Sequence, residues 1–216
     1  DLKELSLFLE TKDTQINYRN LNVPVQNIKV YVDFPSLLKS DLKIKKLNLT
    51  LKELDITELN KLSPIFKPSN FKSLINNKIN EGLLMSQIDI FLDDKGSIKD
   101  FIAKGNIKDL KVEIIKGLNL ENTSLSFFAD KNDILVKNIF GRLENIRISE
   151  GDLRLNLEKG VKLNSNFKSK IKFDKKFPSK FFEIFKKYEL AGLIESLEGE
   201  FNNNIFFDLD KTYKVI

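Results

Sequence analysis

The feature that most limits what this chain can fold into is a strict period-two alternation from Val161 to Phe173. Every odd position in this stretch is apolar or Ser, and every even position is Lys or Asn. Successive side chains of a β-strand point to opposite faces of its sheet, so the pattern predicts a strand with one apolar and one polar face. At about 3.3 Å per residue, such a strand would be roughly 43 Å long. Strands of globular proteins typically have only ~5–6 residues, which span about 17–20 Å.

Similar one-sided runs recur from Leu5 to Leu209 and predict many further strands. Turn-forming sequences separate them, for example Asp93–Gly96, Asp130–Asp133 and Glu158–Gly160. Connections this short join antiparallel neighbours, because parallel strands need a crossover of about a dozen residues or more. The sequence therefore predicts a mainly β fold built as a long, curved antiparallel sheet.

One irregularity is predicted inside this pattern. The apolar positions change parity between Ile107 and Leu110. A one-residue change of parity moves the following side chains to the other face unless a bulge or tight turn corrects it. We therefore expect a bulge or turn around Lys108 and Asp109.

Two stretches depart from alternation and predict short helices near residues 69–82 and 178–189. Each opens with a Pro-Ser-x-Phe sequence, at Pro68 and Pro178, and continues with helical spacing of apolar residues. No linker-like change of composition divides the chain. We expect one continuous domain over residues 1–216, punctuated by two or three short helices and belonging to a longer protein.

A sheet with one apolar face must cover that face with helices, with a second sheet or by closing on itself. The predicted helices are too short to cover so many strands. A sealed sandwich or barrel remains one interpretation, whereas long strands and 18 Phe residues favour an open groove, half-barrel or taco-like, whose apolar face holds apolar guests. The residues expected to line such a groove are Leu49, Leu51, Ile88, Ile90, Phe101, Ile107, Val112, Leu125, Phe127, Leu153, Leu155, Leu157, Leu163, Phe167, Ile171, Phe173 and Phe207.

Most catalytic chemistry is excluded by composition. The chain has no Cys and no His, so it has no thiol nucleophile, no His-based triad and no common zinc site. Asp93-Asp94 and the Asp208-x-Asp210 pair could bind a hard cation or act as an acid and base. Both pairs follow predicted strands, where acidic residues commonly solvate a turn. We expect no enzymatic activity, no cofactor and no metal, with a carboxylate-based carbohydrate-active enzyme as a remote alternative.

The charge pattern gives little support for nucleic-acid binding. The net charge is only +5. Arginine is the residue best suited to phosphate and base recognition, and the chain has only four: Arg19, Arg142, Arg147 and Arg154. The Lys-rich stretch from Lys159 to Lys187 can be a solvated strand face or a patch that attracts anionic lipid headgroups. We therefore expect no nucleic-acid partner.

Several segments share a pattern of strands that covers most of the chain. They are Ile44–Leu59, with a strand followed by a Leu-Asp-Ile element, Pro64–Leu92, Phe101–Ile107, Leu125–Asp130 and Gly151–Leu155. In this pattern the chain resembles the AsmA-like family, which includes AsmA, TamB and YhdP, and the YhdP branch in particular.

The resemblance implies a β-groove that carries phospholipid acyl chains passively between the inner and outer membranes of a bacterium, as part of envelope biogenesis. It further implies a periplasmic location, with the full-length protein anchored in the inner membrane by a segment that this sequence does not contain. The alternative that the residues leave open is a structural or adhesive all-β sandwich module of a secreted or surface protein.

Overall fold

The structure is a computed structural model that describes residues 7–18, 21–39, 41–58, 78–115, 117–173 and 196–210. These residues are mainly β, as the sequence predicts. In chain order, the elements are β1 (Leu7–Lys12), β2 (Gln15–Tyr18), β3 (Leu21–Val32), α1 (Phe34–Leu38), β4 (Ile44–Leu51), β5 (Leu54–Asp55), β6 (Ile79–Leu92), β7 (Ile98–Ile115), β8 (Leu118–Asp130), β9 (Asp133–Leu143), β10 (Ile146–Asn156), β11 (Val161–Phe173) and β12 (Leu197–Leu209).

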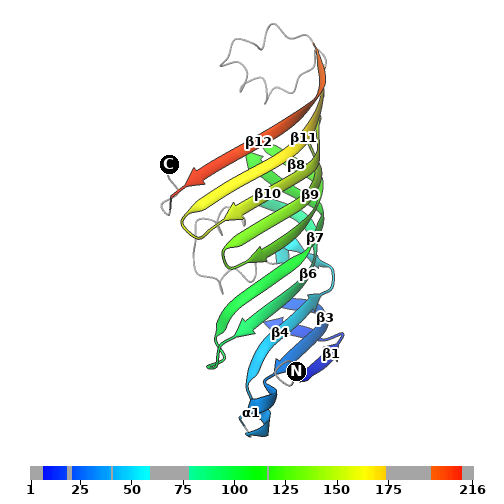
Figure 1. Cartoon of the computed structure of the whole chain (residues 1–216). Coiled ribbons are helices and arrows are strands. Elements are labelled where there is room, and N and C mark those ends of the chain that lie inside the picture. The colour runs from blue at the N-terminus through cyan, green and yellow to red at the C-terminus, as the bar shows by residue number, and fades with distance from the viewer. Residues whose placement is uncertain are drawn as a thin grey trace.

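The described strands form a single 12-stranded antiparallel sheet whose order follows the chain, except that β2 and β5 lie off the main path. The order is β1-β3-β4-β6-β7-β8-β9-β10-β11-β12, while β2 pairs with β3 and β5 pairs with β6. The first and last strands of this order do not pair with each other, so the sheet is open. Figure 1 shows the strands stacked in chain order, tilted, from β1 at one end to β12 at the other. The predicted antiparallel meander is confirmed, and the described residues form one sheet, whereas a sandwich needs two.

The strands are as long as the alternation predicts. The stretch Val161–Phe173 is a single 13-residue strand, β11, and β7 extends over 18 residues. Because these long strands pair along most of their length, strand ends lie mainly at the hairpin turns. The alternation of side chains between the two faces therefore continues from one hairpin to the next.

A line of irregular backbone positions crosses the middle of the sheet. Asp109, Asn122, Asn138 and Glu150 have φ angles of 50°, 49°, 55° and 50°. Each lies at a break in strand register, in β7, β8, β9 and β10 respectively. Gly82, with a φ of 153°, lies at a register break in β6. Because these strands are consecutive neighbours, the bulges form one crease across the sheet.

The crease explains the curvature of the sheet in physical terms. An extra residue on one strand bends that strand and increases its twist, and Asn and Asp tolerate the left-handed conformation better than most residues. Bulges that follow one another from strand to strand therefore bend the sheet along one line. The bulge predicted around Lys108 and Asp109 is confirmed, since the register shifts between Ile107 and Leu110.

The predictions of helices agree less well with the structure. Residues Ile79–Gly82, expected to end the first helix, begin strand β6, because their backbone pairs with β7. The rest of that expected helix, 69–77, and the expected helix at 178–189 lie outside the described residues. Conversely, the structure has a short helix that the sequence analysis did not place, α1 (Phe34–Leu38), which begins directly after the alternating residues of β3. Asp33 caps this short helix by accepting the N–H of Ser36, and Pro35 lies in its first turn.

Candidate functional site: the apolar face of the sheet

Strand register places the predicted groove residues of the paired strands on one common face, here called the apolar face. Directly paired residues of neighbouring strands point to the same side of a sheet. Leu49 pairs with Ile88, and Phe127 lies between Gly105 and Val136. The same face continues through further direct pairs, namely Leu47 with Ile90, Ile90 with Phe101, Ile107 with Leu125, Val136 with Leu153, Leu155 with Leu163, and Leu163 with Phe207.

The remaining predicted groove residues also lie on paired strands or directly beside them. Leu51 pairs with Val25, Val112 pairs with Leu120, and Ile171 pairs with Ile146. Phe167 pairs with Asn203, and the backbone of Phe173 pairs with Leu197 at the far end of β11. Leu157 lies just beyond β10, where its N–H donates to the Asn132 carbonyl oxygen over 2.7 Å. The sequence thus located the apolar face, while the structure shows that it runs without interruption from strand to strand.

Several side chains of the apolar face that lie next to the crease are buried. Leu84, Leu110 and Ile148 are 7%, 6% and 9% exposed, and Thr123 is 0% exposed. Each lies close in sequence to the crease position of its strand. The crease is therefore one of the well-buried parts of the apolar face, and a second is the region of Val25 and Leu54, which are 1% and 5% exposed. Ile56 adds a local cover, because its side chain comes within 3.2 Å of the position that a Cβ on Gly82 would occupy.

On the two outer strands, the apolar face is accessible. Leu9 of β1 is 66% exposed, and Phe207 of β12 is 52% exposed. Among the described residues, one sheet is present and no second layer covers these two strands.

A few small polar residues lie on the apolar face, and sequence reasoning gave them no role. Ser86 Oγ donates to the Lys104 carbonyl oxygen (3.2 Å), Thr123 Oγ1 donates to that of Glu121 (3.3 Å), and Ser165 Oγ donates to that of Asp152 (3.0 Å). Because these hydroxyls donate to the backbone, they are buried without an unsatisfied donor. The face therefore stays non-ionic even where it is not aliphatic.

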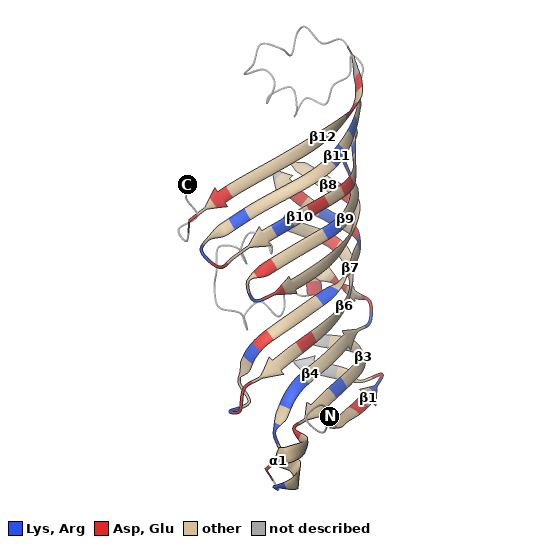
Figure 2. Cartoon of the chain, viewed as in Figure 1, with Lys and Arg blue, Asp and Glu red and all other residues tan. Residues whose placement is uncertain are grey.

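The opposite face, here called the polar face, is a ladder of cross-strand ion pairs. Figure 2 shows blue bands on β11 beside red bands on β12. The nitrogen–oxygen distances are 2.8 Å for Lys162–Asp208, 3.5 Å for Lys170–Glu200, 3.1 Å for Lys172–Glu198 and 2.5 Å for Lys168–Glu150. The described part of the Lys-rich stretch is thus matched by carboxylates on neighbouring strands. This pairing favours the interpretation as a solvated strand face over that of a headgroup-binding patch.

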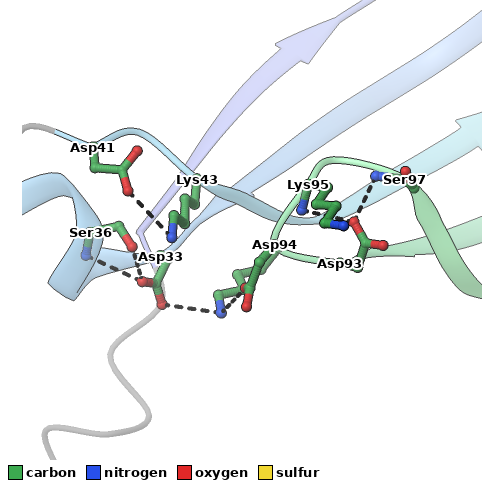
Figure 3. Close-up of polar contacts among 9 residues, drawn as sticks. Asp33, Ser36, Asp41, Lys43, Asp93, Asp94, Lys95 and Ser97 are labelled. Carbon is green, nitrogen blue, oxygen red and sulfur yellow. Dashed lines mark hydrogen bonds and ion pairs between the residues drawn. The ribbon is translucent and has the colours of Figure 1, made fainter.

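The Asp93-Asp94 pair organises a turn. One oxygen of Asp93 accepts the backbone N–H groups of Lys95 and Ser97, both over 2.9 Å, which closes the β6–β7 hairpin. Asp94 lies 3.7 Å from the Lys45 ammonium, which also lies 3.8 Å from Asp33 (Figure 3). The Lys45 side chain thereby links the cap of α1 to this hairpin.

The other acidic groups have structural partners as well. Asp208 forms an ion pair with Lys162 across β11 and β12. The hydrogen bond from Ser36 is the largest of several effects that lower the pKa of Asp33. Among the described residues, no group of three or more His, Cys, Asp or Glu side chains is placed to hold one metal ion.

Two hollows described on the molecule differ in their lining. One of about 560 Å³ is lined by Glu121, Arg142 and Lys172 of the polar face, together with nearby residues. Such a charged lining suits water better than a hydrocarbon chain. A second, of about 780 Å³, lies where the ladder between β4 and β6 is interrupted, and its mainly apolar lining includes Met85 and Phe127.

Comparison of the chain with family models, with curated proteins and with solved structures gives no match. The resemblance to AsmA-like proteins therefore stays a prediction from sequence. Of the helices in the described part of the chain, none has the length and apolar character needed to cross a bilayer.

Proposed function

We propose that this chain is a segment of an AsmA-like, bridge-type protein that carries phospholipid acyl chains along its apolar face. In this proposal, transport takes place in the periplasm, between the inner and outer membranes, contributes to envelope biogenesis and involves no catalysis. The full-length protein would be anchored in the inner membrane. The observation that supports the proposal is the continuity of the apolar face from β1 to β12 within one open sheet.

The energetic argument concerns the hydrocarbon tail. Transfer of an acyl chain into water costs about 0.8 kcal/mol per methylene, so a sixteen-carbon chain crossing water alone would face on the order of 13 kcal/mol. A continuous apolar surface that shields the tail at each step removes most of this barrier. Such shielding needs no chemical reaction.

The character of the apolar face suits loose, sliding contact. Its side chains are aliphatic, aromatic or small and hydroxylated, apart from the Asn203 amide, which donates to the Phe167 carbonyl oxygen. The hydroxyls of Ser86 and Ser165 likewise donate to backbone carbonyl groups. The ion pairs described above lie on the opposite face. A phospholipid headgroup would find no charged partner on the apolar face and would stay in water at the open side of the sheet.

A paired substitution tests the proposal. Phe167→Asp places a charge on the apolar face of β11, whereas Asn164→Asp places the same charge on an exposed polar position of the same strand, opposite Arg154. Desolvation of a carboxylate costs more than the 1.4 kcal/mol that corresponds to a tenfold change in binding. We expect at least about tenfold weaker binding of an NBD-labelled phosphatidylethanolamine for Phe167→Asp and little change for Asn164→Asp.

Circular dichroism and native mass spectrometry complete the test. The wild-type chain should co-purify with phospholipid, and both variants should keep their β-sheet spectrum. If Phe167→Asp unfolds the chain, Phe207→Asp at the more exposed β12 position provides a milder variant with the same expectation. Absence of lipid binding in the wild type, or equal losses in the apolar-face and polar-face variants, would contradict the proposal.

A further inference from the structure

A row of charged residues crosses the polar face from β6 to β12, and its signs alternate except in one stretch. The direct strand pairs along this row are Glu81 with Lys111, Glu121 with Arg142, Arg142 with Arg147, Arg147 with Lys170, and Lys170 with Glu200. The Lys111 ammonium lies 4.0 Å from a Glu81 oxygen and 3.4 Å from a Glu121 oxygen. The alternation breaks on β9, β10 and β11, where Arg142, Arg147 and Lys170 follow one another.

Two members of this stretch, Arg142 and Arg147, here called the arginine pair, have no carboxylate partner. Among the described residues, neither of them forms an ion pair, and both are exposed. The acidic neighbours in the row are engaged elsewhere, since Glu121 lies against Lys111 and Glu200 lies 3.5 Å from Lys170. Like charges directly opposite each other destabilise a strand pair. An anion between the two guanidinium groups would therefore stabilise this part of the sheet.

The geometry of the arginine pair suits one anion held by both side chains. Directly opposed residues of antiparallel strands have Cβ atoms about 4.5–5.5 Å apart, so two long side chains on the same face can reach one group. Each guanidinium presents a fork of N–H donors that matches phosphate or carboxylate oxygens. A phosphate monoester carries about −1.5 to −2 charges and three acceptor oxygens. Two guanidinium groups match this better than they match a carboxylate, which has a single charge and two oxygens.

Hollows on both sides of the arginine pair leave room for the rest of a ligand. The hollow of about 560 Å³ beside Arg142 is also lined by Asn119, Glu121, Glu144, Asn145 and Lys172. A further hollow, of about 580 Å³, lies beside Arg147, and its lining includes Ser149, Lys168 and Lys170. Their amide, hydroxyl and ammonium groups can donate hydrogen bonds to additional oxygens. The site therefore combines two charged forks with space for a group attached to the anion.

We propose that Arg142 and Arg147 form a binding site for a phosphate group on the polar face of the sheet, with the phosphate held between the two guanidinium groups. The phosphate belongs either to a soluble ligand or to a phospholipid headgroup at a bilayer surface, and the recognition chemistry is the same for both. The site lies on the face opposite to the apolar face. It does not depend on lipid carriage, so either proposal can fail without the other.

The arginine Nε–H groups report anion binding directly in nuclear magnetic resonance spectra. The chain has four arginines, so isotope-labelled arginine gives four such signals, and single substitutions assign them. Titration with inorganic phosphate, at a constant low ionic strength set with sodium chloride, should shift the signals of Arg142 and Arg147 together with one saturable Kd. The signal of Arg154, which lies 3.5 Å from Asp133, should shift little and serves as an internal control.

A matched pair of substitutions locates the site. Arg147→Gln removes one fork, and we expect phosphate to bind at least about tenfold more weakly, because charge-assisted hydrogen bonds are lost. Arg154→Gln removes the same charge from the same strand and face and should leave the Kd of phosphate unchanged. Without phosphate, the urea midpoint of Arg147→Gln should not fall below that of the wild type, because the substitution removes a pair of like charges.

Three results would overturn the proposal: no saturable shift of Arg142 and Arg147 in the wild type, equal weakening of phosphate binding in both variants, or the same shifts when sodium chloride alone is added. Co-sedimentation with phosphatidylglycerol vesicles, compared with phosphatidylcholine vesicles, distinguishes the two sources of the phosphate. Binding to phosphatidylglycerol that Arg147→Gln weakens assigns a lipid headgroup. Phosphate binding without vesicle binding assigns a soluble ligand.

Discussion

At the scale of single residues, the sheet depends on a few positions where a side chain cannot be accommodated. Gly105 of β7 is the clearest case. A Cβ at this position would lie 2.1 Å from the Met85 carbonyl oxygen and 2.9 Å from the Ser86 Cα. Both contacts are with the backbone of β6, which cannot move aside without disturbing the β6–β7 ladder. The close approach of two backbones explains why only Gly fits there.

Gly105→Ala is therefore expected to lower the free energy of unfolding by about 1–3 kcal/mol, the usual range for overpacking. Urea denaturation followed by circular dichroism measures this change. Gly199→Ala in β12 is the matched control, because its Cβ would meet only the Phe201 ring, at 3.2 and 3.3 Å, and that ring is 41% exposed and free to turn. A control variant as unstable as Gly105→Ala would contradict this explanation.

At the scale of elements, the hairpin turns are held by carboxylates that accept backbone N–H groups. Asp130 accepts the N–H groups of Asn132 and Asp133, both over 2.8 Å, in the turn between β8 and β9. These hydrogen bonds, with that from Asn132 the larger, lower the pKa of Asp130 below its ordinary value of 3.8. Asp93 accepts two N–H groups in the same way between β6 and β7.

The lowered pKa of Asp130 predicts a pH dependence. A carboxyl whose pKa is lower in the folded than in the unfolded state stabilises the fold above its unfolded pKa, and this stabilisation is lost as pH falls through the folded pKa. We expect Asp130→Asn to be less stable than the wild type near pH ~6, with a difference that shrinks as pH falls below about 3.8. Urea midpoints measured across this pH range test the expectation. A difference that stays constant with pH would contradict it.

At the scale of the whole molecule, the sheet is a linear array in which each strand contacts mainly its two neighbours. Buried side chains occur in the middle of the array, where Leu84 and Leu110 are 7% and 6% exposed, and also on β3, where Val25 is 1% exposed. The outer strands β1 and β12 lack a second neighbour among the described residues. In an array of this kind, local opening costs less free energy at the ends than at the centre.

Hydrogen exchange should reveal this gradient. We expect the amides of β1 and β12 to exchange at least about tenfold faster than those of β6, β7 and β8, because edge strands open without breaking the creased centre. Hydrogen–deuterium exchange with mass spectrometry resolves these strands as separate peptides. Equal protection along the array would show instead that the sheet opens as one cooperative unit.

Much of the fold was predictable because alternation is a local property. The strand Val161–Phe173, the turns at Asp93 and Asp130 and the bulge near Asp109 follow from residue types within a few positions of one another. The end of the first expected helix was wrong, because Ile79–Gly82 has helical spacing but pairs with β7. Tertiary pairing overrode a weak local preference there. The helix α1 was missed because its Asp33 cap and Pro35 follow an apolar run.

The sequence by itself determined that the chain forms long strands with one apolar and one polar face, because side-chain direction in a strand depends only on position parity. Only the tertiary structure decided that bulges in β6 to β10 line up as one crease across the sheet. Such alignment depends on the register between strands, and register is fixed by pairing over the whole sheet rather than by any one segment.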